Sequence, residues 1–158
     1  MPIAIKNSKI DISSEETTKE LAKDFSNYLK GGEIIFLYGE MGVGKTTFVK
    51  HLINQFQINK KIQITEVTSP TFNLVNEYDV GIFTIQHYDI YRLTNSEETK
   101  NIGLLENSTE TLTLIEWPEK IEKKIEKKID LFFEYGEDFK KRFLSIEGIN
   151  NEKLNDIR

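Results

Sequence analysis

The chain has 158 residues, of which 38% are hydrophobic and 30% charged, which is the size and composition of one globular domain. It contains no cysteine, so disulfides, thiolate catalysis, iron–sulfur clusters and zinc fingers are excluded. The net charge of −5 argues against nucleic-acid binding over the whole surface, and no apolar stretch reaches the length of a signal peptide or a membrane span. We therefore expect a single cytoplasmic domain over residues 1–158 that does not associate with a membrane. Residues 149–158 should form a frayed tail.

The first half of the chain predicts a helix, a buried strand and a second helix. Ser13 followed by Glu16 matches a capping box, and apolar residues then recur every four positions, so we expect a helix over about 14–30 that a Gly-Gly pair ends. The continuous apolar run 34–38 is typical of a strand buried on both faces. A glycine-rich turn follows, and the second helix continues to about Phe56. Its apolar face consists of Phe48, Val49, Leu52, Ile53 and Phe56.

The second half of the chain predicts strands, in part as hairpins. The expected strands are 73–79, 82–88, 111–117, 129–135 and 142–147, and the first two read as a hairpin. Helical patterns occur over 96–103 and 119–128. A buried strand between helices, together with hairpins, predicts an α/β fold with a mixed central sheet.

A phosphate-binding loop is the clearest chemical signal. Residues 39–46, GEMGVGKT, match G-x-x-x-x-G-K-[ST] at every fixed position. In such a loop the backbone N–H groups and the N-terminus of the next helix point at phosphate oxygens. The pattern assigns Lys45 to the β- and γ-phosphates and the Thr46 hydroxyl to Mg²⁺, and we expect Thr47 at the α-phosphate. The expected nucleotide-binding residues are Gly39, Glu40, Met41, Gly42, Val43, Gly44, Lys45, Thr46 and Thr47.

Two carboxylates follow apolar strands and fit the remaining chemistry. A nucleotide hydrolase needs an acid for Mg²⁺ and a group that orients the attacking water. We expect Glu116 to bind the metal with Thr46, because Trp117 and a proline stop its strand directly after it. Asp89 then acts through water or holds the metal's bound water. Lys45, Asp89 and Glu116 are thus the expected catalytic residues.

Three features have both a functional and a structural interpretation. His87 shares a strand face with Asp89, but a lone histidine favours a structural role. Trp117 is either a wall of the nucleotide site or core packing. The segment Ser69–Phe72 is either a γ-phosphate sensor or a turn set by its proline.

Five segments occur in a fixed order along about residues 14–147. They are GEMGVGKTTF (39–48), SPTFNLVNEY (69–78), HYDIYRL (87–93), GLLE (103–106) and IEWPE (115–119). Together they resemble the TsaE family, the bacterial ATPases required for threonylcarbamoyladenosine formation on tRNA. The resemblance implies a P-loop NTPase-like three-layer fold, and ATP and Mg²⁺ as cofactors. It also implies the TsaB–TsaD transferase complex as protein partner, with tRNA reached only through that complex. ATP binding would drive docking, and hydrolysis would reset the complex.

The resemblance also assigns residues one by one. Lys45, Thr46 and Thr47 would hold the phosphates and Mg²⁺, Glu116 would be the metal-site glutamate, and Asp89 the functional aspartate. The loops 69–72 and 88–93 would sense the nucleotide or face the partner, and the segment 15–18 would contact the nucleotide.

Other nucleotide-dependent functions remain alternatives. The guanine-reading pattern Asn-Lys-x-Asp is absent, since the run 59–62 lacks the aspartate, so adenine is favoured. Small-molecule kinases clamp phosphates with several arginines, and of three arginines here only Arg92 lies in a candidate site segment. A nucleotide-dependent binding switch stays open, and for any hydrolase we expect weak activity without a partner. The lysines of 120–127 would share one helical face, for which a solvated surface is favoured over contact with tRNA phosphate.

Overall fold

The central strand of the sheet is β2 (Ile34–Tyr38), and it is buried on both faces, as its unbroken apolar run predicts. It pairs in parallel with β5 (Thr111–Glu116) on one side and with β6 (Ile129–Tyr135) on the other. The computed structural model describes residues 9–70, 74–93, 109–121 and 124–149. Within these residues the sheet has seven strands in the order β1-β7-β6-β2-β5-β4-β3, which confirms the predicted α/β fold with a mixed sheet.

The remaining strands extend the sheet on both sides. β4 (Thr84–Asp89) runs parallel to β5, and β3 (Val75–Asp79) pairs with β4 as the predicted hairpin. At the other edge, β7 (Arg142–Glu147) is antiparallel to β6, and the short β1 (Ile10–Asp11) is antiparallel to β7. The parallel strands β4, β5, β2 and β6 therefore end at one edge of the sheet, where ligands of open α/β sheets bind.

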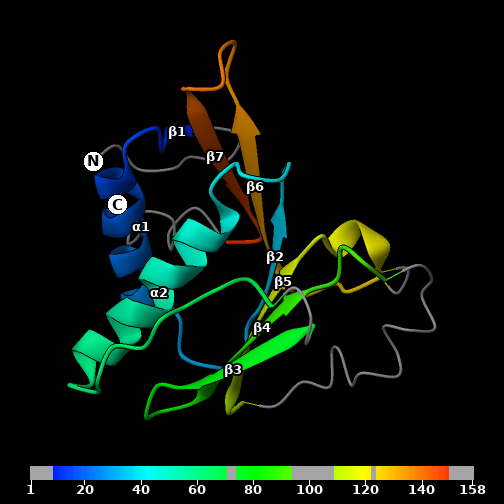
Figure 1. Cartoon of the computed structure of the whole chain (residues 1–158). Helices are drawn as coiled ribbons and strands as arrows, with labels where there is room; N and C mark the ends of the chain where they lie inside the picture. The colour runs from blue at the N-terminus through cyan, green and yellow to red at the C-terminus, as the bar shows by residue number, and fades with distance from the viewer. Residues whose placement is uncertain (1–8, 71–73, 94–108, 122–123, 150–158) are drawn as a thin grey trace.

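The two α-helices of the described residues cover the same face of the sheet (Figure 1). They are α1 (Glu15–Tyr28) and α2 (Lys45–Asn59), and they pack against each other as well as against the strands. The rings of Phe25 and Phe48 meet edge to face at 5.5 Å between centroids. The predicted apolar face of α2 is buried in this larger core, which includes Phe48, Val49, Leu52, Ile53 and Phe56.

Helix α1 does not use the predicted capping residue. Ser14 is the N-cap, and its Oγ accepts a hydrogen bond from the N–H of Glu16 at 3.2 Å. The hydroxyl of Ser13 accepts a hydrogen bond from the backbone N–H of Arg142 in β7 at 3.0 Å. The prediction of Ser13 as the cap is wrong, because a distant strand occupies its hydroxyl.

The opposite face of the sheet carries a smaller apolar cluster. Its buried members are Ile34, Phe36, Tyr88, Ile90, Leu93 and Ile115. The chain that follows β5 covers this cluster, with Ile121 and Ile125 packed against it. In the described residues this layer contains one short 3₁₀-helix, η1 (Pro118–Lys120), while 121 and 124–128 are not helical.

The helix predicted over 119–128 is therefore wrong for the described residues, in which Lys120, Lys124 and Lys127 do not share a helical face. The backbone of Ile121 is extended, which ends η1 directly. Ile121 and Ile125 pack on the apolar cluster of this face from a chain that is not helical. Contact with the sheet therefore outweighed the helical spacing of the sequence.

Two predictions concern residues at or beyond the limits of the described chain. The short helix expected over 96–103 lies outside the described residues, as do residues 150–158. Ile149 was expected in a frayed tail, but it is buried in the larger core, so that expectation is wrong for this residue. No helix in the described ranges is both long and apolar enough to cross a membrane.

Candidate functional site

The predicted phosphate loop connects the end of β2 to the start of α2, as its pattern requires. Gly44 is the N-cap of α2 with a φ of 117°, a left-handed conformation that favours glycine. At Gly39 a Cβ would lie 2.7 Å from the carbonyl oxygen of Phe133 in the neighbouring strand β6. The positive φ therefore explains why position 44 of the motif is glycine, and the close approach of β6 explains why position 39 is glycine.

Lys45, the first residue of α2, is buried within the loop at 4% exposure. Its Nζ donates a hydrogen bond to the carbonyl oxygen of Gly39 at 2.5 Å and lies 3.9 Å from the centroid of the Trp117 ring. Burial lowers the pKa of Lys45, while the negative charges of the nearby carboxylates Glu116, Glu119 and Asp89 oppose this shift. An ammonium group has three N–H donors, so Lys45 retains the capacity to bind phosphate oxygens.

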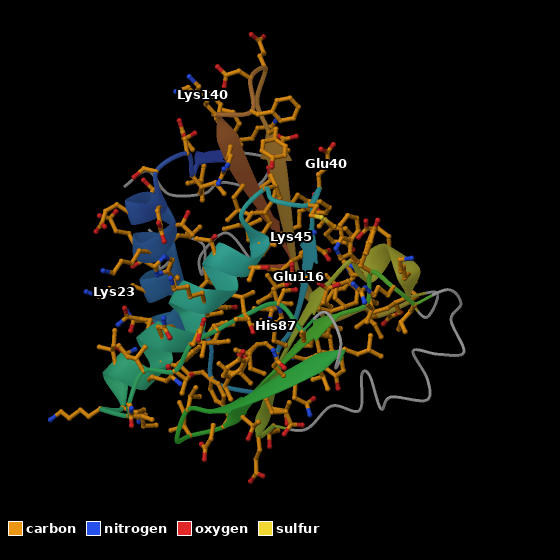
Figure 2. All side chains as sticks on the ribbon, viewed as in Figure 1. Lys23, Glu40, Lys45, His87, Glu116 and Lys140 are labelled. Atoms are coloured by element: carbon orange, nitrogen blue, oxygen red, sulfur yellow. The ribbon has the colours of Figure 1, made fainter. Side chains whose placement is uncertain are left out.

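Thr46 and Glu116 meet although 70 residues separate them. The Thr46 hydroxyl lies 3.4 Å from both carboxylate oxygens of Glu116, which is 3% exposed. Parallel pairing places Glu116 beside Leu37 of β2, next to the loop. Figure 2 shows Lys45, Glu116 and His87 between the start of α2 and the sheet, and Nε2 of His87 is 2.6 Å from Oε2 of Glu116.

Asp89 ends β4 in register with Glu116 of β5, so the two predicted carboxylates are neighbours. Its Oδ2 accepts a hydrogen bond from the Ser69 hydroxyl at 2.8 Å, and its Oδ1 accepts one from the N–H of Tyr91 at 3.1 Å. Ser69 is thereby tied to the site, while 71–73 lie outside the described residues. The geometry links the loop before β3 to the carboxylate that ends β4.

One cavity of about 330 Å³ collects these side chains. It is lined by Met41, Gly42, Gly44, Lys45, Thr46, Thr47, Ser69, Asp89, Tyr91, Arg92, Glu116 and Trp117. Three predicted nucleotide-binding residues do not line it: Gly39, Glu40 and Val43. Gly39 receives the Lys45 hydrogen bond, Val43 is buried in the core, and Glu40 is exposed. Trp117 lines the cavity, which favours its interpretation as a wall of the site.

A second, smaller cavity of about 120 Å³ adjoins the first and shares Gly44 and Thr47 with it. Glu15 and Thr18 of α1 line it, as does Arg142 of β7. The Nε of Arg142 is buried and has no hydrogen-bond partner in the described part of the chain. Sequence reasoning missed Arg142 because it fits a strand pattern, although the rarity of arginine in this lysine-rich chain was a signal.

The side-chain oxygens of Thr46 and Glu116 are suitable ligands for a magnesium ion. A hydroxyl and a carboxylate are hard oxygen ligands, and Mg²⁺ is usually held by one or two carboxylates with waters and substrate phosphates. Among the described residues, no group of three or more His, Cys, Asp or Glu could hold a metal ion. A metal beside Thr46 and Glu116 would thus take its other ligands from water and phosphate.

The sheet order and the loop between β2 and α2 define the class of P-loop NTPase-like α/β folds. Residues 12–143 match the family model described as "Threonylcarbamoyl adenosine biosynthesis protein TsaE". The chain belongs to this family, which takes part in threonylcarbamoyladenosine biosynthesis on tRNA.

Comparisons with individual proteins support the same family assignment. The Rickettsia bellii protein named "tRNA threonylcarbamoyladenosine biosynthesis protein TsaE" is 45% identical over 113 residues, which are 72% of this chain and 76% of that protein. The Rickettsia conorii protein of the same name is 44% identical over 108 residues, 68% of this chain and 59% of that protein. The crystal structure of Bacillus subtilis YdiB matches with a TM-score of 0.66 at 24% identity, over 94% of this chain and 90% of that one, and shows the same fold.

Proposed function

We propose that the protein is a Mg²⁺-dependent ATPase that binds and resets the TsaB–TsaD transferase complex during threonylcarbamoyladenosine formation at position 37 of tRNA. The observation that carries the proposal is the convergence of Lys45, Thr46 and Glu116 at a phosphate loop in a chain of this family. tRNA is reached through the complex, and the place of action is the cytoplasm, where bacterial tRNA is modified.

Some residues of the site bind the phosphates and the metal, and another orients the attacking water. The loop N–H groups and the Lys45 ammonium bind phosphate oxygens, with Thr47 at the α-phosphate. Thr46 and Glu116 would hold Mg²⁺, which would supply positive charge to offset the negative charge of the phosphates. Asp89, anchored by the Ser69 hydroxyl at 2.8 Å, orients the attacking water.

The nucleoside end of ATP extends into the second cavity. This cavity begins at Gly44 and Thr47, which also line the phosphate site. Glu15 and Thr18 border it, and the buried Nε of Arg142 offers a donor to the ribose or the base. The segment before and at the start of α1 therefore contributes to ATP binding.

Hydrolysis is slow in the isolated protein and accelerates when the partner closes the site. Met41 and Tyr91, which line the cavity, are 68% and 47% exposed. Water reaches such an open rim, and a partner that covers it can exclude water and add charged groups. Groups supplied by a partner accelerate other P-loop hydrolases by about 10³- to 10⁵-fold.

The test combines phosphate release with co-purification. We expect slow ATP hydrolysis by the protein alone, faster hydrolysis with TsaB and TsaD, and co-purification of the two subunits that is stronger with ATP than without. Rapid turnover without any other protein, or co-purification indifferent to ATP, would contradict the proposal.

Two alternatives give different outcomes in the same assays. A small-molecule kinase forms ADP only with an acceptor and yields a phosphorylated product. A pure binding switch retains ATP-dependent association but releases no phosphate at any partner concentration.

A further inference from the structure

His87 is a buried polar side chain to which the proposed chemistry gives no role. It lies on β4 and is 0% exposed. Its Nε2 is 2.6 Å from Oε2 of Glu116, and in the described chain its Nδ1 has no hydrogen-bond partner. Ile85, two residues earlier on the same face, is an ordinary core residue. An apolar side chain would fill the place of His87 without the cost of burying polar atoms, so packing alone does not explain the imidazole.

The two oxygens of Glu116 have different surroundings. Both oxygens lie 3.4 Å from the Thr46 hydroxyl, and Oε2 alone is also 2.6 Å from Nε2 of His87; among the described residues the Thr46 hydroxyl is the one hydrogen-bond partner of Oε1. An ionised carboxylate can only accept, so the ring must donate from Nε2. In the neutral ring this tautomer leaves Nδ1 as a bare acceptor, which is the atom without a partner.

We propose that His87 is the positioning residue for Glu116. Its Nε2–H holds Oε2 and fixes the orientation of the carboxylate, which leaves Oε1 available to Mg²⁺ beside Thr46. The inference rests on the proposed function, because it requires Glu116 to bind the metal. Hydrogen-bond partners of metal-binding side chains orient their ligands, and their loss costs about 10- to 100-fold in metal affinity or activity.

The experiment compares two substitutions that differ in reach. His87→Gln keeps an N–H donor at the approximate distance of Nε2, whereas His87→Asn is one methylene shorter and cannot span the gap to Glu116. Ile85→Val, on the same strand and face, is the matched control for a change in the core. The readouts are Mn²⁺ affinity of the ADP complex by electron paramagnetic resonance, and ADP affinity without metal by calorimetry.

We expect His87→Asn to weaken Mn²⁺ binding by about 10- to 100-fold. His87→Gln should retain most of the affinity, and Ile85→Val should equal the wild type. ADP affinity without metal should be unchanged in all three variants, since no phosphate contact depends on His87.

Three results would overturn the inference: wild-type Mn²⁺ affinity in His87→Asn, equal losses in the Gln and Asn variants, or a matching loss of metal-free ADP affinity. Glu116→Gln distinguishes failure at two levels. If it leaves Mn²⁺ affinity unchanged while ADP still binds, Glu116 is not the metal ligand and the role of His87 falls with it, while the nucleotide site stands. If the wild type binds no ADP at all, the proposed function itself fails.

Discussion

Lys45 is held in an environment that is unfavourable for its charged form in the folded protein. Burial lowers its pKa below the ordinary 10.5, so the charged form destabilises the folded state at every pH below the folded pKa. This cost fades as the pH rises towards 10.5. We expect Lys45→Met to raise the melting temperature of the nucleotide-free protein by a few degrees, since 1 kcal/mol shifts it by about 2–4 °C in a domain of this size. Differential scanning calorimetry provides the measurement.

The same substitution should weaken nucleotide binding. Charge-assisted hydrogen bonds contribute about 1.5–3 kcal/mol, so ATP affinity should fall by at least about 10-fold, as titration calorimetry would show. The matched control is Lys50→Met, because Lys50 is an exposed lysine on the same helix. Unchanged ATP affinity in Lys45→Met would refute the assignment of the phosphate loop.

Glu116 and Asp89 should differ in what they do for Mg²⁺. We expect Glu116→Ala to reduce Mg²⁺-dependent hydrolysis far more than nucleotide affinity, because its oxygens lie 3.4 Å from the Thr46 hydroxyl. Asp89→Ala should slow hydrolysis with less change in the Mg²⁺ concentration required. The measurement is the rate of phosphate release as a function of Mg²⁺ concentration. If the two variants show the opposite pattern, the two carboxylates have been interchanged.

Tyr38 gives the fold a pH limit on the alkaline side. Burial, followed by the charge of Asp130, raises the pKa of Tyr38 from 10.0 to about 12. A raised pKa contributes stability that is complete below pH 10 and is lost as the pH rises towards about 12. We expect the wild type to lose stability relative to Tyr38→Phe across this interval in urea unfolding. A constant difference between the two proteins from pH 9 to 12 would contradict the shift.

The sequence was informative about the site wherever the chemistry was local. The loop 39–46 is one contiguous motif, and the positions of Glu116 and Asp89 at one edge of the sheet could be predicted because each ends an apolar strand. Arg142 and the partner of His87 could not be predicted, because both depend on contacts between residues far apart in the chain. The sequence pattern did not show which side chains would contact each other across the sheet.

At the scale of elements, the start of α1 tests the corrected capping residue. The Ser14 hydroxyl caps the helix, whereas that of Ser13 binds β7. Loss of an N-cap serine costs about 1 kcal/mol, so Ser14→Ala should lower the free energy of unfolding by that amount and Ser14→Asp should recover it. Urea unfolding measures both variants. If Ser14→Ala is as stable as the wild type, the cap lies elsewhere.

In the segment after β5, the spacing of apolar residues did not predict the secondary structure correctly. Its isoleucines and lysines are spaced as on an amphipathic helix, yet Ile121 and Ile125 pack on the sheet from a mostly irregular chain. The strands β5 and β6 flank β2, and the chain has to pass from one to the other. Contact with the sheet decided the conformation here, whereas the continuous apolar run of β2 was enough to predict a strand buried on both faces.

At the scale of the whole molecule, ligand binding should stabilise the fold. A ligand that binds only the folded state adds about 2.7 kcal/mol at 100 times its dissociation constant. For this chain length that corresponds to a rise of about 5–10 °C in melting temperature. We expect this rise with Mg²⁺ and ADP together, and not in Lys45→Met. An equal rise in that variant would indicate binding outside the phosphate loop.

Trp117 is the single tryptophan of the chain, and its ring lies 3.9 Å from the ammonium of Lys45 and 4.7 Å from the ring of Tyr91. Indole emission is sensitive to nearby charge and to solvent access. When Lys45 moves onto a phosphate, the fluorescence of the unlabelled protein should change. The intrinsic fluorescence of Trp117 should therefore report whether a nucleotide occupies the proposed site.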